Sequence, residues 1–158
     1  RPKTLAEYVV ELLINNNKKI TMAESCTGGL IASLVTQVAG ASSVFEAGFV
    51  TYSNKSKTQL LNVSTQTLAN SGAVSEQTVL AMAQGALDIT DADFAIAVSG
   101  IAGPDGGTPD KPVGMVWFGF FINGKIISQK QLITGNRHTV RIKAIEFALS
   151  NLLMLLQK

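Results

Sequence analysis

The chain has 158 residues, of which 46% are hydrophobic and 15% are charged, and its net charge is +2 at pH 7. This composition is typical of one soluble domain with a hydrophobic core, spanning residues 1–158, and it excludes an intrinsically disordered chain. Lys and Arg are scattered and form no basic block, so a nucleic-acid partner is not expected.

The first third of the sequence alternates between helical and extended patterns. Residues 4–19 carry apolar side chains at helical spacing and end in a run of Asn, which predicts an amphipathic helix. Residues 20–25 are an apolar run of strand length. Residues 28–40 return to helical spacing and stop at Gly40, a residue type common at helix C-termini. Residues 43–54 are rich in Val, Phe and Tyr, which predicts a strand.

The middle of the sequence continues this alternation. A short helix is predicted at residues 54–61, and a longer one at residues 75–90 with Ser75 as its N-cap. Residues 93–100 are almost entirely apolar, as expected for a central strand that helices cover on both faces.

The last third predicts a hairpin followed by one long helix. Residues 113–133 form two strands joined at Asn123-Gly124, the dipeptide that best marks a two-residue hairpin turn. Residues 136–157 form the last helix, whose apolar face contains Val140, Ala144, Phe147 and Leu152. The whole order predicts an α/β fold, a three-layer α/β/α sandwich with a mixed sheet.

Cysteine and histidine are too scarce for several kinds of site. Cys26 is the single cysteine, so an internal disulfide is excluded and a reducing compartment, the cytoplasm, is expected. His138 is the single histidine, so a structural zinc site is excluded, and we expect neither metal nor cofactor. No segment has the pattern of a membrane span or a signal peptide. Because the sequence begins Arg1-Pro2 without Met, we expect a trimmed chain or a piece of a longer protein.

Three loops follow predicted strands and have unusual compositions. Residues 24–29 and residues 51–57 each lead from a strand into a helix, and residues 99–114 follow the most apolar strand. Paired glycines at a helix start let a ligand approach the backbone, whose free N–H groups attract anions. None of the loops matches a Walker A or G-x-G-x-x-G pattern. The third loop is long and rich in Gly and Pro, which favours a functional role, although a wide structural turn would have the same composition.

The first two loops contain candidates for nucleophilic chemistry. Ser25 is one, although serine often does no more than cap a helix. Cys26 is another, but a thiolate would need His138 as its partner. Lys57 could act as a base for Ser25 if burial kept its amine uncharged, while a solvated lysine is the commoner case. Tyr52 could relay a proton or be a half-buried strand aromatic.

The sequence contains four distinctive segments, in this order: AESCTGGL, TYSNKSK, SGIAGPDGGTPDKPVG and GNRHTVR. Together they resemble the CinA C-terminal domain family, whose characterised members are nicotinamide-nucleotide amidohydrolases. The resemblance implies a three-layer α/β/α fold and hydrolysis of the carboxamide of nicotinamide mononucleotide to nicotinic acid mononucleotide and ammonia. It also implies that the family's serine, tyrosine and lysine correspond to Ser25, Tyr52 and Lys57. Met115 departs from the small residue expected after KPVG.

Such a hydrolase needs a nucleophile, a base, donors for the oxyanion and an anchor for the substrate phosphate. Under this hypothesis Ser25 attacks the carboxamide carbon, and neutral Lys57 takes its proton directly or through Tyr52. The candidates for the phosphate are the glycine-rich loop with Thr108, and Arg137, for which a surface ion pair is the alternative role. The candidate oxyanion donors are the backbone N–H groups of Cys26, Thr27, Gly28 and Gly29. The other candidate substrate-binding residues belong to the glycine-rich loop: Ser99, Gly100, Gly103, Gly106, Gly107 and Thr108.

Two other functions stay open at the level of sequence. One is a nucleotide-binding module without turnover, and the other is a scaffold associated with competence or DNA damage, after which relatives are named. The expected partner is a small mononucleotide rather than a nucleic acid or a membrane. A homo-oligomer is expected as well, because small α/β enzymes with apolar helix faces commonly pair.

Overall fold

The computed structural model describes residues 1–158 and contains five strands and six α-helices. The strands are β1 (Ile20–Glu24), β2 (Phe49–Val50), β3 (Phe94–Gly100), β4 (Met115–Ile122) and β5 (Lys125–Leu132). The helices are α1 (Leu5–Asn15), α2 (Leu30–Thr36), α3 (Asn54–Leu61), α4 (Thr65–Ser71), α5 (Glu76–Ile89) and α6 (Arg137–Leu156), and a short 3-10 helix, η1, spans Ala41–Ser43.

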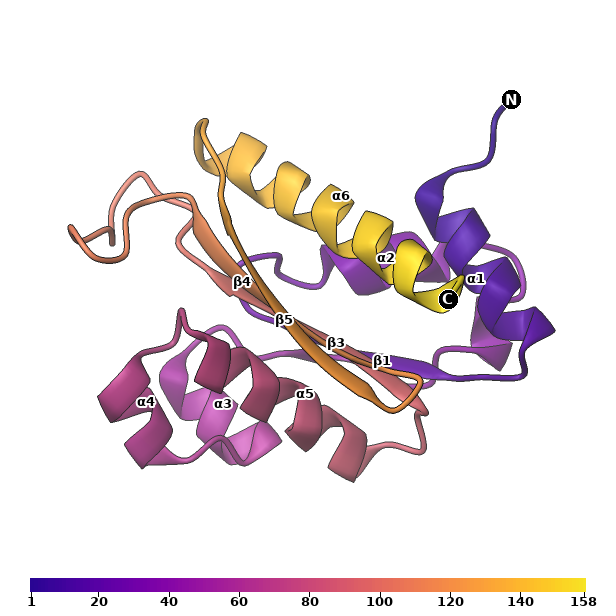
Figure 1. Cartoon of the computed structure of the whole chain (residues 1–158), viewed down its shortest axis with the longest axis horizontal. Helices are drawn as coiled ribbons and strands as arrows, with labels where there is room; N and C mark the ends of the chain where they lie inside the picture. Colours follow the sequence, from indigo (N-terminus) through magenta and orange to yellow (C-terminus); the bar gives the residue numbers. More distant parts are fainter.

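The strands form one mixed sheet in the order β2-β1-β3-β4-β5. β1 pairs in parallel with β2 and β3, whereas β4 is antiparallel to both β3 and β5. Helices α1, α2 and α6 cover one face of the sheet, and α3, α4 and α5 cover the other (Figure 1). The predicted α/β/α sandwich with a mixed sheet is therefore confirmed.

The sheet separates two hydrophobic cores. A cluster of 25 buried residues lies on the side of α1, α2 and α6, and a cluster of nine lies on the side of α3, α4 and α5. The predicted central strand is confirmed, since every residue of β3 from Phe94 to Ser99 is buried. Burial on both faces requires the nearly continuous apolar run that the sequence shows there.

Two predicted boundaries are wrong. The strand expected at residues 43–54 is only β2, because the chain pairs with β1 at Phe49 and Val50 alone apart from one isolated bridge at Phe45. The helix expected at residues 28–40 ends at Thr36, and Gly40 instead precedes η1 with a φ of 88°. A glycine in this left-handed conformation therefore marks the start of η1 rather than the end of α2.

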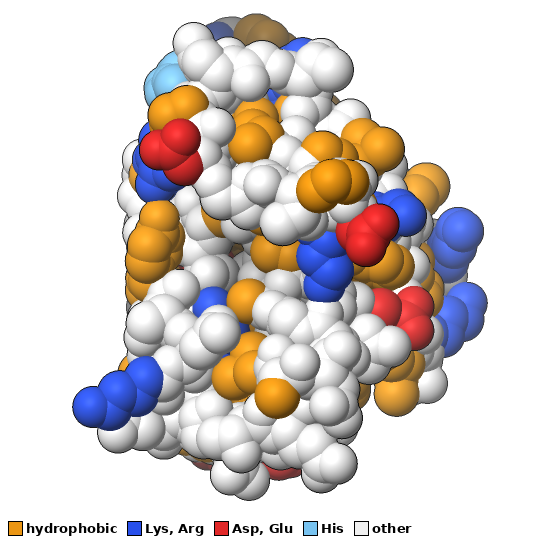
Figure 2. Space-filling view, turned by 90° about the vertical axis from the view of Figure 1, so that its left-hand side faces the viewer, with side chains coloured by type: hydrophobic (Ala, Val, Ile, Leu, Met, Phe, Trp, Pro, Cys, Tyr) orange, Lys and Arg blue, Asp and Glu red, His pale blue; other side chains and the backbone are white.

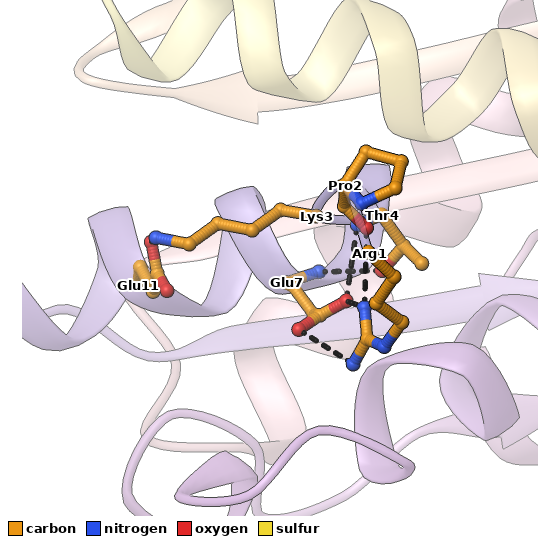
Figure 3. A network of polar contacts seen from close by, with 6 residues as sticks. All are labelled: Arg1, Pro2, Lys3, Thr4, Glu7 and Glu11. Carbon is orange, nitrogen blue, oxygen red and sulfur yellow. Dashed lines mark hydrogen bonds and ion pairs between the residues drawn. The ribbon is translucent and has the colours of Figure 1, made fainter.

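The hairpin and the first helix form as their local sequences predict. Asn123 and Gly124 have φ angles of 52° and 76°, as a two-residue turn of type I′ requires. At the start of α1, the Thr4 side chain accepts a hydrogen bond from the Glu7 backbone N–H, and the Glu7 carboxylate accepts one from the Thr4 N–H. Figure 3 shows this capping box, with Arg1 paired to Glu7 at 2.6 Å. None of the helices is both long and apolar enough to cross a lipid bilayer.

Candidate functional site

The parallel half of the sheet brings three loops to one end of the molecule. Strands β1, β2 and β3 run in the same direction, so the loops that follow them all start at the same end of the sheet, where the carboxyl ends of these strands lie. A cavity of about 190 Å³ lies among these loops and the start of α6. Figure 2 looks onto this end and shows a hollow near its centre, bordered by hydrophobic and basic side chains. The cavity is lined by Ser25, Cys26, Tyr52, Lys57, Ala73, Val74, Ser99, Gly100, Ala102 and Arg137.

Ser25 lies directly after β1, and its side chain is not a helix cap. Its backbone N–H donates to the Val98 carbonyl at 2.9 Å, which extends the pairing of β1 with β3 by one residue. The N-cap of α2 is Gly29, which has a φ of 93° and makes no side-chain capping bond. The capping alternative for Ser25 is therefore wrong, and its hydroxyl lines the cavity.

The cap of α2 comes from Glu24, which the sequence analysis did not single out. Its carboxylate is 1% exposed and accepts hydrogen bonds from the backbone N–H groups of Ile31 and Ala32 at 3.0 and 3.1 Å. The Thr27 hydroxyl also donates to it at 2.6 Å. A buried carboxylate at a helix N-terminus satisfies N–H groups that have no partner within the helix. Glu24 thus ties α2 to the last residue of β1 and fixes the turn between them.

Lys57 is a buried amine that faces Ser25. Its side chain comes from the first turns of α3, is 1% exposed, and has no carboxylate within ion-pairing distance. The Nζ atom lies 3.0 Å from Ser25 Oγ, 2.8 Å from the Thr51 carbonyl oxygen and 3.3 Å from the Tyr52 carbonyl oxygen. Burial lowers the pKa of Lys57 below its ordinary value of 10.5 because it penalises the charged ammonium.

Arg137 and the Tyr52 phenol form the outer part of the site. Arg137 donates from Nη2 to the phenol oxygen of Tyr52 at 2.9 Å and from Nη1 to the Gly103 carbonyl at 2.7 Å. No carboxylate lies within ion-pairing distance of Arg137, so the surface ion pair weighed as its alternative role is absent. The Tyr52 side chain is 60% exposed and makes no hydrogen bond with Ser25 or Lys57 through its phenol, only through its backbone carbonyl.

The thiol of Cys26 lacks the surroundings of a reactive cysteine. It belongs to the larger hydrophobic core, and burial raises its pKa to about 11, so it is protonated at neutral pH. His138, the only histidine, is exposed and does not line the cavity. No group of three or more His, Cys, Asp or Glu side chains is placed to hold a metal ion.

The turn after Ser25 contains the predicted oxyanion donors, but of these residues only Cys26 lines the cavity, and Thr27, Gly28 and Gly29 do not. The Gly28 N–H is occupied by the Ser25 carbonyl at 3.0 Å, whereas the N–H groups of Cys26, Thr27 and Gly29 have no acceptor within the protein. Arg141 of α6, a second residue that the sequence analysis missed, donates to the carbonyls of Cys26 and Thr27 at 2.9 and 3.3 Å. The guanidinium therefore fixes the Cys26–Thr27 and Thr27–Gly28 peptide groups in the turn after Ser25.

The glycine-rich loop contributes only its beginning to the cavity. Ser99 and Gly100 line it, and Gly103 reaches it indirectly by accepting a hydrogen bond from Arg137. The outer part of the loop does not line it, namely Gly106, Gly107 and Thr108. The Thr108 hydroxyl accepts from the Lys111 N–H at 3.1 Å and so closes a turn within the loop. Met115 lies instead in a neighbouring hollow of about 500 Å³ with Trp117 and Lys130.

Comparison with known proteins assigns this chain to a family. A sequence model of the CinA C-terminal domain matches residues 2–156. The chain belongs to the CinA C-terminal domain family. Each CinA segment noted in the sequence contributes to the cavity: AESCTGGL through Ser25, TYSNKSK through Lys57, SGIAGPDGGTPDKPVG through Ser99 and GNRHTVR through Arg137. Glu24 and Arg141 also lie inside these segments, so their membership of the segments is the feature of the sequence that could have identified them.

Relatives within the CinA family are similar over most of the chain. A nicotinamide-nucleotide amidohydrolase PncC from Enterobacter agglomerans is 55% identical over 135 residues, covering 85% of this chain and 82% of the relative. A protein of the same name from Escherichia coli strain K12 is 49% identical over 149 residues, covering 94% and 90%. The crystal structure of the competence damage-inducible protein A (ComA) from Klebsiella pneumoniae subsp. pneumoniae MGH 78578 matches with a TM-score of 0.93 and 39% identity, covering 97% of this chain and 95% of that one.

Proposed function

We propose that this chain hydrolyses the carboxamide of nicotinamide mononucleotide to nicotinic acid mononucleotide and ammonia, with Ser25 as nucleophile and Lys57 as base. The observation that carries the proposal is the 3.0 Å contact between Lys57 Nζ and Ser25 Oγ inside a cavity. The relatives named nicotinamide-nucleotide amidohydrolase, at 55% and 49% identity, supply the substrate and the reaction.

The surroundings of Lys57 Nζ are compatible with an uncharged amine, and burial favours that state. An uncharged amine has two hydrogens to donate and one lone pair to accept with. In the structure Nζ donates to Ser25 Oγ and to the carbonyls of Thr51 and Tyr52. In the proposed reactive state the uncharged amine keeps the two bonds to the carbonyls, and its lone pair accepts the hydroxyl hydrogen of Ser25 instead. Burial without a carboxylate favours this uncharged state, which is the state a general base requires.

In the proposed reaction, Ser25 Oγ forms a bond to the carboxamide carbon while its proton passes to Lys57 Nζ. The carbonyl oxygen becomes an oxyanion, for which the candidate donors are the N–H groups of Cys26 and Thr27, because they have no acceptor within the protein. The Lys57 ammonium returns the proton to the nitrogen as the C–N bond breaks, and ammonia leaves. Water then adds to the acyl carbon and gives a proton to Lys57 Nζ. As the ester C–O bond breaks, Lys57 returns this proton to Ser25 Oγ, and nicotinic acid mononucleotide leaves.

The direct transfer between Ser25 and Lys57 is favoured over a relay through Tyr52. The phenol of Tyr52 is hydrogen bonded to Arg137, at the outer side of the site.

A cavity of about 190 Å³ is smaller than the pockets that hold whole drug-sized ligands, so it fits the pyridine carboxamide better than the whole nucleotide. The ribose and phosphate then extend outward, where the Arg137 guanidinium can pair with the phosphate.

Substitution of Ser25 by Ala tests this proposal. We expect kcat for ammonia release to fall about a thousandfold or more, because the nucleophile is removed, while calorimetry still detects binding of the mononucleotide. The matched control is Cys26→Ala, which removes the neighbouring thiol and should keep substantial activity, since that thiol is buried and protonated.

Three outcomes would contradict the proposal. Near-normal turnover by Ser25→Ala would exclude Ser25 as nucleophile. Complete loss of activity in Cys26→Ala with an intact fold would favour the thiol instead. Binding of the mononucleotide to the wild-type chain without any ammonia release would indicate a nucleotide-binding module without turnover.

A further inference from the structure

Strand β5 leaves one long edge of the sheet unpaired. It is the last strand in the order β2-β1-β3-β4-β5 and pairs only with β4. Figure 1 views the sheet from this edge, and no helix lies in front of β5. The strand is eight residues long and contains no proline. An exposed edge of this kind is a template for pairing with another strand, and proteins block unwanted pairing by shortening or covering the edge or by placing charges such as lysine on it. β5 carries Lys125 and Lys130 but is neither short nor covered.

The turn of the hairpin determines which backbone groups face outward. In a hairpin with a two-residue turn, Ile122 and Lys125 form a hydrogen-bonded pair, and such pairs recur at every second residue. The Ile133 N–H donates to the Gly114 carbonyl at 2.8 Å, which follows the same alternation. The outward-facing backbone groups therefore belong to the even-numbered residues Ile126, Ser128, Lys130 and Leu132.

The side chains of these residues are arranged symmetrically about Gln129. Ile126 and Leu132 are 63% and 61% exposed, the highest values among the large hydrophobic residues of the chain. They lie three positions on either side of Gln129 and point to the same face of the sheet as Ser128, whose hydroxyl donates to Glu76 of α5 at 2.6 Å. A monomer therefore exposes two hydrophobic side chains on the same edge that has free backbone donors and acceptors.

We propose that a second copy of this chain pairs with β5 in antiparallel orientation, about a two-fold axis at Gln129. In this register Ile126 lies opposite Leu132 of the second copy, and Ser128 lies opposite its Lys130. All four outward-facing residues then form hydrogen-bonded pairs, and the two exposed hydrophobic side chains cover each other. A shift of the axis by one residue or more leaves an outward-facing residue of each copy unpaired.

On the same face, the proposed register brings Lys130 of each copy towards a carboxylate of the other. Lys130 has no carboxylate within ion-pairing distance in the monomer, and its ammonium lies 5.8 Å from the centre of the Trp117 ring. Across the axis it faces Ser128 of the second copy, whose hydroxyl is bonded to the carboxylate of Glu76 there. Each copy thus brings a cation next to the other's carboxylate, as a self-complementary two-fold interface requires.

Molar mass in solution tests the proposal directly. We expect light scattering to give twice the 16.7 kDa of the chain for the wild type, and a single copy for the double variant Ile126→Lys, Leu132→Lys. In the proposed register this variant puts lysines opposite each other at both ends of the interface. The control is Leu60→Lys on α3, where a 51% exposed leucine lies away from β5, and it should remain dimeric. A monomeric wild type, or a double variant that stays dimeric, would overturn the proposal.

A cysteine at the axis tests the register itself. Residue 129 would face its own copy in a non-hydrogen-bonded pair, with Cα atoms about 4.5 Å apart, which a disulfide can bridge. We expect Gln129→Cys to form a disulfide-linked dimer under mild oxidation. Lys125→Cys is the control, because its two copies would lie about 26 Å apart in this register. The wild type gives the background, since its single cysteine is buried.

Failure of Gln129→Cys to cross-link, or equal cross-linking in Lys125→Cys, would overturn the proposed register. Both readouts are independent of ammonia release, so they remain informative whether or not the chain hydrolyses the mononucleotide.

Discussion

Lys57 is among the largest of the almost fully buried side chains in this protein, and its amine has only oxygens of neutral groups around it. A charged ammonium in this place would lose its hydration without gaining a carboxylate. The folded chain therefore favours the uncharged amine more strongly than the unfolded chain does. The neutral amine of Lys57 therefore contributes to the free energy of unfolding. This contribution is fully present above pH 10.5, the pKa of lysine in the unfolded chain, and is lost as pH falls through the lower pKa of Lys57 in the folded chain.

The pH dependence of the reaction follows from the same residue. Because the neutral amine is the base, we expect kcat/KM for ammonia release to rise with pH through the lowered pKa of Lys57, with its midpoint below 10.5. Lys57→Arg should be almost as inactive as Lys57→Ala, since a guanidinium stays protonated. Rates measured across pH for the three proteins check this. Efficient turnover by Lys57→Arg would contradict a neutral lysine base.

At the scale of elements, the position of Lys57 depends on how closely α3 packs on α5. Gly85 of α5 faces the end of α3, and a Cβ atom at Gly85 would lie 1.9 Å from the carbonyl oxygen of Leu61. Glycine inside a helix costs about 1 kcal/mol relative to alanine. The close contact explains why the smallest residue lies at this position: the backbone of α3 occupies the space of a side chain.

Gly85→Ala should therefore destabilise the protein in spite of its better helix propensity. We expect the free energy of unfolding to fall by about 1–3 kcal/mol, and ammonia release to fall too, because α3 must move and carries Lys57 with it. Denaturant titration and the activity assay measure the two effects. The neighbouring exposed residue provides the control: Gln84→Ala should change stability by no more than about 0.5 kcal/mol. A Gly85→Ala variant as stable and as active as the wild type would show that α3 is free to shift.

At the scale of the whole molecule, the candidate site is made from three layers. The carboxyl ends of β1 and β3 supply Ser25 and Ser99, α3 on one face supplies Lys57, and α6 on the other supplies Arg137 and Arg141. Each layer alone has only part of the chemistry. The site therefore exists only when both helical layers are packed on the sheet.

Chelation tests whether these side chains suffice without a metal. We expect ammonia release to be unchanged after prolonged treatment with EDTA followed by removal of the chelator, because Ser25, Lys57 and backbone N–H groups supply every proton and charge that the proposed steps need. A loss of activity that added Zn²⁺ or Mg²⁺ restores would contradict the proposed mechanism. Retained activity in Lys57→Ala would contradict it independently.

Local sequence determined much of the fold. The type I′ turn at Asn123-Gly124, the buried strand at residues 94–100 and the long final helix all formed where their patterns predicted them. These features depend on backbone preference or on the spacing of apolar residues, both of which are properties of a short stretch of chain. The strand predicted at residues 43–54 failed because pairing with β1, rather than β propensity, decides how much of an edge segment becomes a strand.

The candidate site, in contrast to the fold, depended mainly on tertiary structure rather than on local sequence. The family resemblance named Ser25 and Lys57, and the chemistry of arginine at a helix start named Arg137. Spacing alone could not say that Lys57 is buried beside Ser25 or that Glu24 rather than Ser25 caps α2. Ser25 and Lys57 are 32 residues apart, and Arg141 lies 115 residues from the carbonyl it holds. Only tertiary packing sets such distances and excludes water from them. The sequence by itself determined which chemical groups the chain contains. The packing of the helices on the sheet decided which of these groups come into contact and whether they are charged, because burial and proximity are properties of the folded chain.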